Sequence, residues 1–142
     1  MTITFRVYGI PQTKGSTKSF MRPGMRFPIT TNDNPRNKAW AQTVSGEAQR
    51  HRPSMPIAGP VGLVLWFYMP KPKSYPKTKT LFATKRPDLD KMVRSIKDAL
   101  KGVMYLDDAQ VVQLKAAKAY DDAPGVAVAV TDELPPDGDW LL

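Results

Sequence analysis

The feature that most constrains the fold of this chain is a helical repeat of apolar residues between positions 88 and 103. Pro87 and Asp88 supply a start signal for a helix, and Gly102 supplies a stop signal. The apolar side chains recur at i, i+3, i+4, i+7, i+10, i+11 and i+14, which is one continuous face of a 3.6-residue period. The pattern predicts a helix over 88–101 with this buried face: Leu89, Met92, Val93, Ile96, Ala99, Leu100 and Val103.

Four other segments have the patterns of β-strands. Residues 2–8 alternate apolar and polar side chains, as a half-buried strand does. Residues 61–69 are apolar almost throughout, which predicts a strand buried on both faces. Alternation over 112–120 predicts a third strand, and a turn with Pro and Gly leads from it into a last strand over 126–130.

A second helix is predicted between the first two strands. Asn34 is suited to be its N-cap and Pro35 its first residue, and the pattern continues to about Arg50. Its narrow apolar stripe has the spacing i, i+4, i+8: Trp40, Val44 and Ala48.

The mixture of strands and helices predicts a single α+β domain over residues 1–142, in which helices pack on a mixed β-sheet. A length of 142 residues leaves room for one hydrophobic core, and hardly for two. Two basic segments, 11–33 and 70–86, are expected to be loops outside the core. The tail over 132–142 is expected to be loosely held.

Charge is divided unevenly along the chain. Residues 1–87 hold fifteen Lys or Arg against two acids, whereas residues 88–142 hold six against eleven, and the formal net charge is +8. A basic body favours a polyanionic partner, because each neutralised phosphate releases counterions. The alternative is a basic surface that is merely solvated.

Several classes of protein are excluded by composition. The chain has no cysteine, which excludes a disulfide scaffold, thiolate zinc sites and a cysteine nucleophile. His51 is the single histidine, which excludes most histidine-dependent hydrolytic sites. The longest apolar run is too short to span a bilayer, and no basic-then-apolar leader opens the chain. We therefore expect a soluble protein of a reducing compartment, most simply the cytoplasm.

Four aspartates are the candidate catalytic residues. Asp88 and Asp90 bracket the start of the predicted helix, and Asp107 and Asp108 follow it by a short turn. If the next strand runs back alongside the helix, both pairs can reach the same end of the domain. Crowded carboxylates repel, by about 4 kcal/mol for two unit charges about 4 Å apart at an effective dielectric of about 20. A hard cation such as Mg²⁺ relieves that repulsion and also binds waters and phosphate oxygens.

The same acids have a structural interpretation, which their spacing leaves open. Asp88 suits an N-cap, Asp90 a first helical turn, and the other two a turn. Arg94 lies four residues after Asp90, so it either pairs with Asp90 on the helix surface or contacts a phosphate near a metal. A catalytic and a structural role are both compatible with the pattern.

Three short motifs between Arg86 and Gln113 carry a resemblance to a known family. They are Asp88-Leu89-Asp90 at a helix start, then Asp98-Ala99-Leu100, and then Asp107-Asp108-Ala109-Gln110-Val111-Val112 at a turn and strand. In this order and spacing they resemble the RusA family of Holliday junction resolvases. The opening from Tyr8 to Gly15 is similar to the start of phage-borne members.

The resemblance implies a RusA-like, homodimeric endonuclease that resolves four-way DNA junctions by paired nicks in recombination and repair. It implies Mg²⁺ as the cofactor, with Mn²⁺ able to substitute, and a cytoplasmic location, in the host if a phage encodes the chain. By position, Asp88, Asp90 and Asp108 correspond to the catalytic, metal-binding acids, with Asp107 as a further metal ligand. The family often has a catalytic Lys where this chain has Arg94, which keeps the positive charge.

The candidate DNA-binding residues are basic side chains of the two predicted loops, the helix start and the third strand: Lys14, Lys18, Arg22, Lys71, Lys73, Lys77, Lys79, Lys85, Arg86, Lys91 and Lys115. Two alternatives to an endonuclease stay open. One is a catalytically inert module that binds branched DNA, and the other is a basic adaptor for an acidic protein. No membrane partner is expected.

Overall fold

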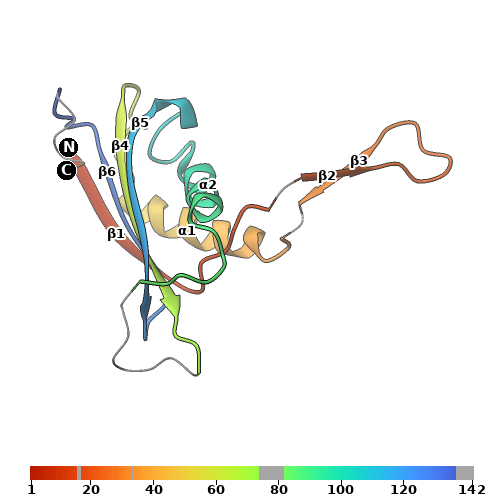
Figure 1. The fold of residues 1–142 in the computed structure, drawn as a ribbon. Helices are drawn as coiled ribbons and strands as arrows, with labels where there is room; N and C mark the ends of the chain where they lie inside the picture. The colour runs from red at the N-terminus through yellow and green to blue at the C-terminus, as the bar shows by residue number, and fades with distance from the viewer. Residues whose placement is uncertain (16, 33, 74–81, 137–142) are drawn as a thin grey trace.

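A mixed sheet of four strands, with two helices on one of its faces, forms the centre of the protein (Figure 1). The structure is a computed structural model, and it describes residues 1–15, 17–32, 34–73 and 82–136. The side chains of residues 17–20 and 29–32 are not described. The architecture confirms the predicted α+β class and the mixed sheet with helices packed on it.

The sheet has the strand order β1-β6-β4-β5. Its strands are β1 (Thr2–Tyr8), β4 (Val61–Pro70), β5 (Val111–Asp121) and β6 (Gly125–Thr131). β6 pairs antiparallel with β1 on one side and with β4 on the other, whereas β4 and β5 pair in parallel. A parallel pair needs a crossover, and helix α2 supplies it between β4 and β5.

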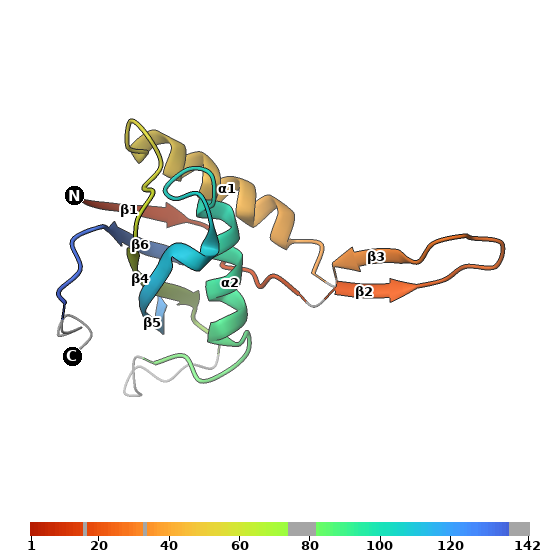
Figure 2. The same cartoon turned by 90° about the horizontal axis from the view of Figure 1, so that it is seen from above.

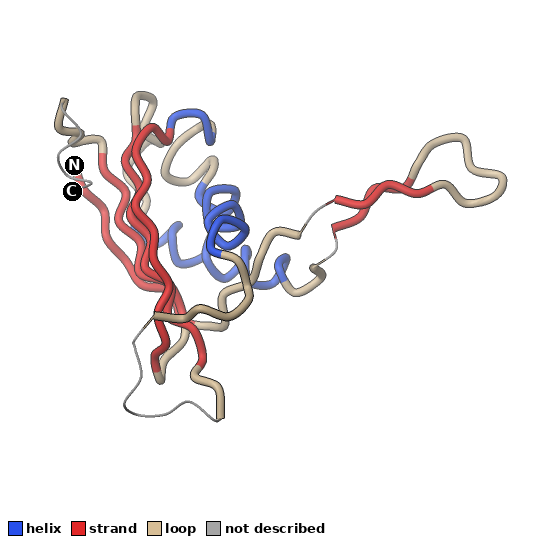
Figure 3. The backbone as a smooth tube through the Cα atoms, in the orientation of Figure 1, coloured by secondary structure: helices blue, strands red, loops and turns tan. Residues whose placement is uncertain are grey.

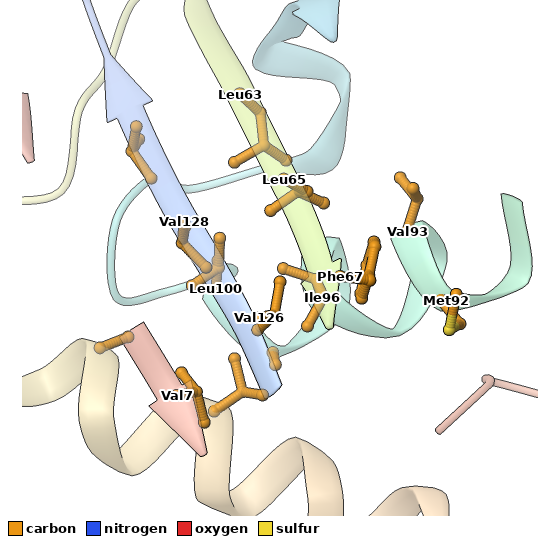
Figure 4. Packing of buried hydrophobic residues seen from close by; sticks show 14 of the residues in the cluster. Val7, Leu63, Leu65, Phe67, Met92, Val93, Ile96, Leu100, Val126 and Val128 are labelled. Carbon is orange, nitrogen blue, oxygen red and sulfur yellow. The ribbon is translucent and has the colours of Figure 1, made fainter. Parts of the chain in front are cut away.

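Helix α2 (Leu89–Leu100) confirms the predicted helix over 88–101, and Asp88 occupies its N-cap position. Its apolar face is buried against the sheet. Figure 4 shows side chains of α2, such as Ile96 and Leu100, lying beside those of β4 and β6, such as Leu65 and Val128. This burial fixes the rotation of the helix about its axis, so the charged residues of α2 lie on its other faces.

Helix α1 (Asn37–His51) has the predicted buried stripe of Trp40, Val44 and Ala48, but it begins later than predicted. Asn34 does not cap it. The Oδ1 atom of Asn34 accepts a hydrogen bond from the backbone N–H of Arg36 at 3.2 Å, and its amide donates to the Thr13 carbonyl at 2.9 Å. The Asn-Pro pair therefore forms a turn before the helix, because an asparagine side chain readily bonds to backbone two residues on.

The prediction that β4 is buried on both faces is wrong for the single chain. Leu63, Leu65 and Phe67 are buried, but Val64 and Trp66 between them are only half-buried. The physical reason is that both helices cover the same face of the sheet (Figure 3). The other face is left uncovered by the described residues.

The prediction of a structureless loop over 11–33 is also wrong. Two antiparallel strands, β2 (Thr17–Phe20) and β3 (Ile29–Asn32), form a hairpin that projects from the body of the protein (Figure 2). Each strand has four residues, too few for the periodicity of side chains to reveal it. The signal that could have predicted the hairpin is Pro23-Gly24, a typical turn pair at its tip.

The basic segment 70–86 lies only partly within the described residues, which exclude 74–81. Contrary to expectation, its end belongs to the core, because Ala83 is 4% exposed and Phe82 forms an isolated bridge with Ala119 of β5. The start of the predicted loose tail is also held. The N-terminal amine lies 2.7 Å from carboxylate oxygens of both Asp132 and Glu133. None of the described helices has the length and apolar character needed to cross a membrane.

Gly125 provides a test of the β1–β6 pairing. A Cβ atom on this residue would lie 2.1 Å from the carbonyl oxygen of Val7, which is backbone and cannot move alone. We expect Gly125→Ala to lower the free energy of unfolding by about 3 kcal/mol, because the two strands must separate locally. Urea denaturation measures this.

Gly46→Ala in α1 is the matched control, since a Cβ there would meet nothing within 4 Å. It should raise the free energy of unfolding by about 0.5–1 kcal/mol, the usual gain of Ala over Gly in a helix. Equal stabilities of the two variants would contradict the described strand register.

Candidate active site

A cleft of about 420 Å³ runs beside α2, with acids and bases on its wall. Asp90, Arg94 and Lys97 reach it from one side of the helix, at i, i+4 and i+7. Asp108 reaches it from the turn before β5. Leu89 and Val93 of the helix and Leu114 and Ala116 of β5 complete the wall. Two of the four predicted aspartates therefore share one cleft.

Gln110 holds the turn that presents Asp108. The turn is a short 3₁₀ helix, η1 (Asp108–Gln110), which directly precedes β5. The Gln110 side chain accepts hydrogen bonds from the backbone N–H groups of Leu106 and Asp107, both at 2.8 Å. Its amide donates to the carbonyls of Ile57 at 2.6 Å and Gly59 at 2.9 Å. One side chain thus ties the turn to the connector before β4.

Asp107 has a structural role in this turn. Its Oδ1 atom accepts a hydrogen bond from the backbone N–H of Ala109 at 2.9 Å, and with Gln110 it forms a capping box. The sequence carries the matching signal, because Gln three residues after a capping residue is the capping-box spacing. The contacts of Asp107 therefore favour the capping interpretation for this acid.

Asp108 lies against a second carboxyl group, that of Asp98, which was not among the predicted site residues. Burial and a shared hydrogen bond with Asp98 raise the pKa of Asp108 above its ordinary value, against the opposing charges of Lys97 and Lys101. Burial works to raise the pKa of Asp98 too, but bonds from Lys14 and Asp108 outweigh it and hold that pKa below its ordinary value. The pair thus holds a proton on Asp108 more readily than an isolated aspartate would.

Lys14 connects this pair to the segment that leads into the hairpin. Its ammonium forms an ion pair with Asp98, and its backbone N–H donates to the Lys91 carbonyl at 3.3 Å. Sequence spacing did not predict this contact, because the two partners lie far apart in the chain. The position of Asp98, about two turns beyond Asp90, gave no clear signal that it would meet Asp108.

Asp88 lies beside the cleft instead of in it. It stands at the N-cap position of α2 but makes no capping hydrogen bond through its side chain. It lines a neighbouring hollow of about 430 Å³ together with Thr13, Arg86, Pro87 and Lys91. The capping interpretation therefore does not account for Asp88, whose carboxylate stands at a hollow that also has two basic residues.

The two predicted pairs of acids do not meet at one end of the domain. β5 begins after the C-terminal end of α2, where Asp108 meets Asp98. Asp98 lies eight residues after Asp90, about 12 Å along the helix axis. Among the described residues, no three acidic or histidine side chains lie close enough together to hold a metal ion.

Asp108 nevertheless has a donor atom to offer a cation that keeps much of its water. Mg²⁺ takes one or two carboxylates and completes its shell with waters and phosphate oxygens. Asp90 and Asp108 are two such carboxylates on one cleft. Within the described part of the chain, the buried Oδ1 atom of Asp108 has no hydrogen-bond partner, and a cation would satisfy it.

Three of the predicted DNA-binding residues surround the start of α2. Arg86 and Lys91 line the hollow beside Asp88, and Lys85 lines an adjoining pocket with Arg86. All three are exposed. They form a basic rim around the candidate acids, as a phosphate-binding surface requires.

The other predicted DNA-binding residues are more scattered. Lys71 pairs with Asp122 at 3.1 Å and Lys73 is exposed, whereas Lys115 alternates with the cleft residues of β5 and so faces the opposite side of the sheet. Arg22 is exposed near the hairpin tip. The side chain of Lys18 and the whole of Lys77 and Lys79 lie outside the described residues.

Comparison with known proteins identifies the family of the chain. Residues 11–131 match the profile of the family described as Endodeoxyribonuclease RusA. The chain belongs to the RusA family, which confirms the resemblance carried by the three aspartate motifs. It is also 36% identical over 139 residues to Uncharacterized protein YqaN of Bacillus subtilis (strain 168), a match that covers 92% of this chain and 96% of that protein.

The contact between Asp98 and Asp108 predicts that ionised Asp108 lowers the free energy of unfolding. Because the pKa of Asp108 is raised in the folded protein, ionising it opposes folding; the cost grows as the pH rises from the ordinary value of 3.8 towards the raised pKa and is constant above it. We expect Asp108→Asn to raise the melting temperature at pH 7 without divalent ions by about 2–4 °C. Calorimetry across a pH series should show the gain shrinking as the pH falls towards the ordinary value of 3.8.

Asp107→Ala is the matched control at the neighbouring position. It removes a cap and should lower the stability by about 1 kcal/mol. An Asp108→Asn protein less stable than the parent at pH 7 would contradict the carboxyl contact.

Proposed function

We propose that this protein is a Mg²⁺-dependent, structure-selective DNA endonuclease that resolves four-way junctions by paired nicks in recombination and repair. The observation that carries the proposal is the cleft shared by Asp90 and Asp108, with a basic rim beside it, in a chain of the RusA family. A nuclease that uses carboxylates and a metal needs neither histidine nor cysteine. We place its action in the cytoplasm.

Asp90 and Asp108 would hold the cation, with Asp88 at the neighbouring hollow as a third carboxylate. A bound Mg²⁺ supplies polarisation of the scissile phosphate and activation of water. Asp107 and Gln110 act through the turn, since their hydrogen bonds keep Asp108 at the cleft.

Arg94 and Lys97 supply positive charge on the wall of the same cleft. Arg94 would contact the scissile or an adjacent phosphate and stabilise the negative charge that develops there. A guanidinium does not readily give up a proton, so its part is electrostatic. Lys97 lies one turn further along and can add a second charge.

A catalytically inert module that binds branched DNA is the second candidate. It is favoured by the separation of the acids along α2, since within the described residues no three of them form a metal-binding group. Binding DNA through the basic rim needs no such group. The two candidates differ in whether divalent ions permit nicking.

Asp90→Asn separates them. We expect this variant to abolish Mg²⁺-dependent nicking of a synthetic four-way junction and to bind the junction as well as the parent or better, because one carboxylate near the phosphates is neutralised. A gel of the junction and a matching linear duplex, each with Mg²⁺ and with chelator, measures both properties.

Asp122→Asn is the control, because this exposed acid pairs with Lys71 away from the cleft. It should cut at the parent's rate. Undiminished cleavage by Asp90→Asn would count against the assigned site, and binding by the parent without nicking under any divalent ion would favour the inert module. If the parent did not bind DNA at all, the remaining alternative would be a basic adaptor for an acidic protein.

The proposed enzyme acts as a homodimer, since two equivalent sites can address symmetry-related strands of a junction. The uncovered face of the sheet supports this part of the proposal. A shallow apolar hollow of about 290 Å³ on it is lined by Val64, Trp66, Ala127 and Ala129, among others. A strand that is apolar on both faces is expected to be covered on both, and a second copy would cover it.

Trp66→Glu tests this interface. A carboxylate on the apolar face should convert the dimer to monomers, because its burial between two copies would cost several kcal/mol without a partner. Sedimentation equilibrium measures the mass. Met55→Glu, at a residue 76% exposed elsewhere, should remain dimeric. A parent protein that sediments as a monomer with or without junction DNA would refute the dimer.

A further inference from the structure

The β2–β3 hairpin ends in a tip, residues 21–28, which stands clear of the rest of the protein in both views (Figures 1 and 2). The tip has a defined turn. The backbone N–H of Met25 donates to the Arg22 carbonyl at 3.1 Å, and Gly24 has a φ of 83°. With Pro23 before it, this is the pattern of a type II turn, in which the third residue needs a positive φ. The side chains around the turn are thus presented in a set arrangement.

The tip exposes apolar side chains that take no part in the core. Met21 is 56% exposed, Met25 41% and Phe27 75%. Single exposed apolar residues are ordinary, but three within seven residues on a projecting hairpin mark a contact surface. These side chains have no described role in folding, so a partner outside the chain is the natural reason for them.

Charge selects the kind of partner. Arg22 and Arg26 alternate with the apolar residues of the tip, and residues 1–32 contain no acid. Because the tip carries two arginines and no acid, a polyanion matches it better than a neutral or basic surface does. DNA can bind both kinds of side chain at the tip. Its phosphates attract the arginines, and its bases stack on apolar and aromatic side chains.

The base of the hairpin is anchored beside the candidate active site. On one side Lys14 bonds to the backbone of Lys91 and pairs with Asp98. On the other side, the Asn34 amide donates to the carbonyl and hydroxyl of Thr13, at 2.9 and 3.1 Å. Residues 17–23 span roughly 20 Å when extended. A DNA molecule that has one phosphate in the cleft can therefore contact the hairpin tip through another part of the same DNA.

We propose that the hairpin tip binds the branch point of the DNA, where Phe27, flanked by Met21 and Met25, stacks on an exposed base. In a continuous duplex each base is stacked on both sides, so insertion of a side chain must first unstack a step. At a branch the stack is already interrupted, and the same contact costs less. The tip therefore makes the protein prefer branched to linear DNA. This inference rests on the proposed function in taking DNA as the substrate.

The test uses binding in chelator, so that it does not depend on cleavage. The probes are a synthetic four-way junction with 2-aminopurine at the crossing and a linear duplex with 2-aminopurine at the same sequence position. We expect the parent to raise the fluorescence of the junction probe alone. Phe27→Ala should lose that rise and about tenfold of the preference for junction over duplex, the scale of one stacked base. Phe27→Trp should restore both.

Met55→Ala is the matched control, since it truncates an equally exposed apolar residue away from the hairpin, and it should behave as the parent does. Full junction preference and an unchanged fluorescence rise in Phe27→Ala would overturn the inference. The inference would also be overturned if Phe27→Ala lost binding to both DNAs equally, or if this substitution converted a dimer to monomers on sedimentation. A parent that shows the fluorescence rise but never nicks with Mg²⁺ would refute the proposed endonuclease and uphold the tip contact.

Discussion

Burial of one face of α2 against the sheet is the interaction on which the candidate site depends. The apolar side chains of this helix allow one rotation about its axis, since any other would expose Ile96 and Leu100 to water. With the rotation set, Asp90, Arg94 and Lys97 must point along the edge of the sheet, where β5 forms the opposite wall of the cleft. The hydrophobic effect, which has no direction of its own, thereby orients the charged groups.

One charged group of the cleft opposes folding, because the pKa of Asp108 is raised in the folded protein. Asp98 and Asp108 face each other, which raises the pKa of Asp108, while Asp98 forms an ion pair with Lys14. Either a bound cation or protonation of one carboxyl relieves the repulsion between two carboxylates.

Long patterns in the sequence predicted well. The six apolar positions that fall in α2 and the alternation of β1 are local, repeated signals, and both elements appear with nearly the predicted bounds. The hairpin was missed because its strands are too short to show a period. The start of α1 was misplaced because Asn34 bonds to Thr13, a tertiary contact that no local pattern reveals.

Within the candidate site, the sequence identified candidate acids but not how they group in space. Asp90 and Asp108 share the cleft, but the direction of β5 relative to α2 decides that Asp108 meets Asp98 first, and direction is a property of the whole topology. Gln110 could have been found, since it has the spacing of a capping box with Asp107. Lys14 could not, because its partner lies more than eighty residues along the chain.

The strand order has a consequence for how the chain folds as it is made. β1 ends at Tyr8, yet its neighbour β6 begins only at Gly125, and β6 also separates β1 from β4. The sheet therefore cannot close around its core while a ribosome is still adding the residues of β5. Pairings so remote in sequence are slow to form, and they make folding a late, concerted event rather than a gradual one. A growing chain would carry the acids of the cleft long before it could assemble them.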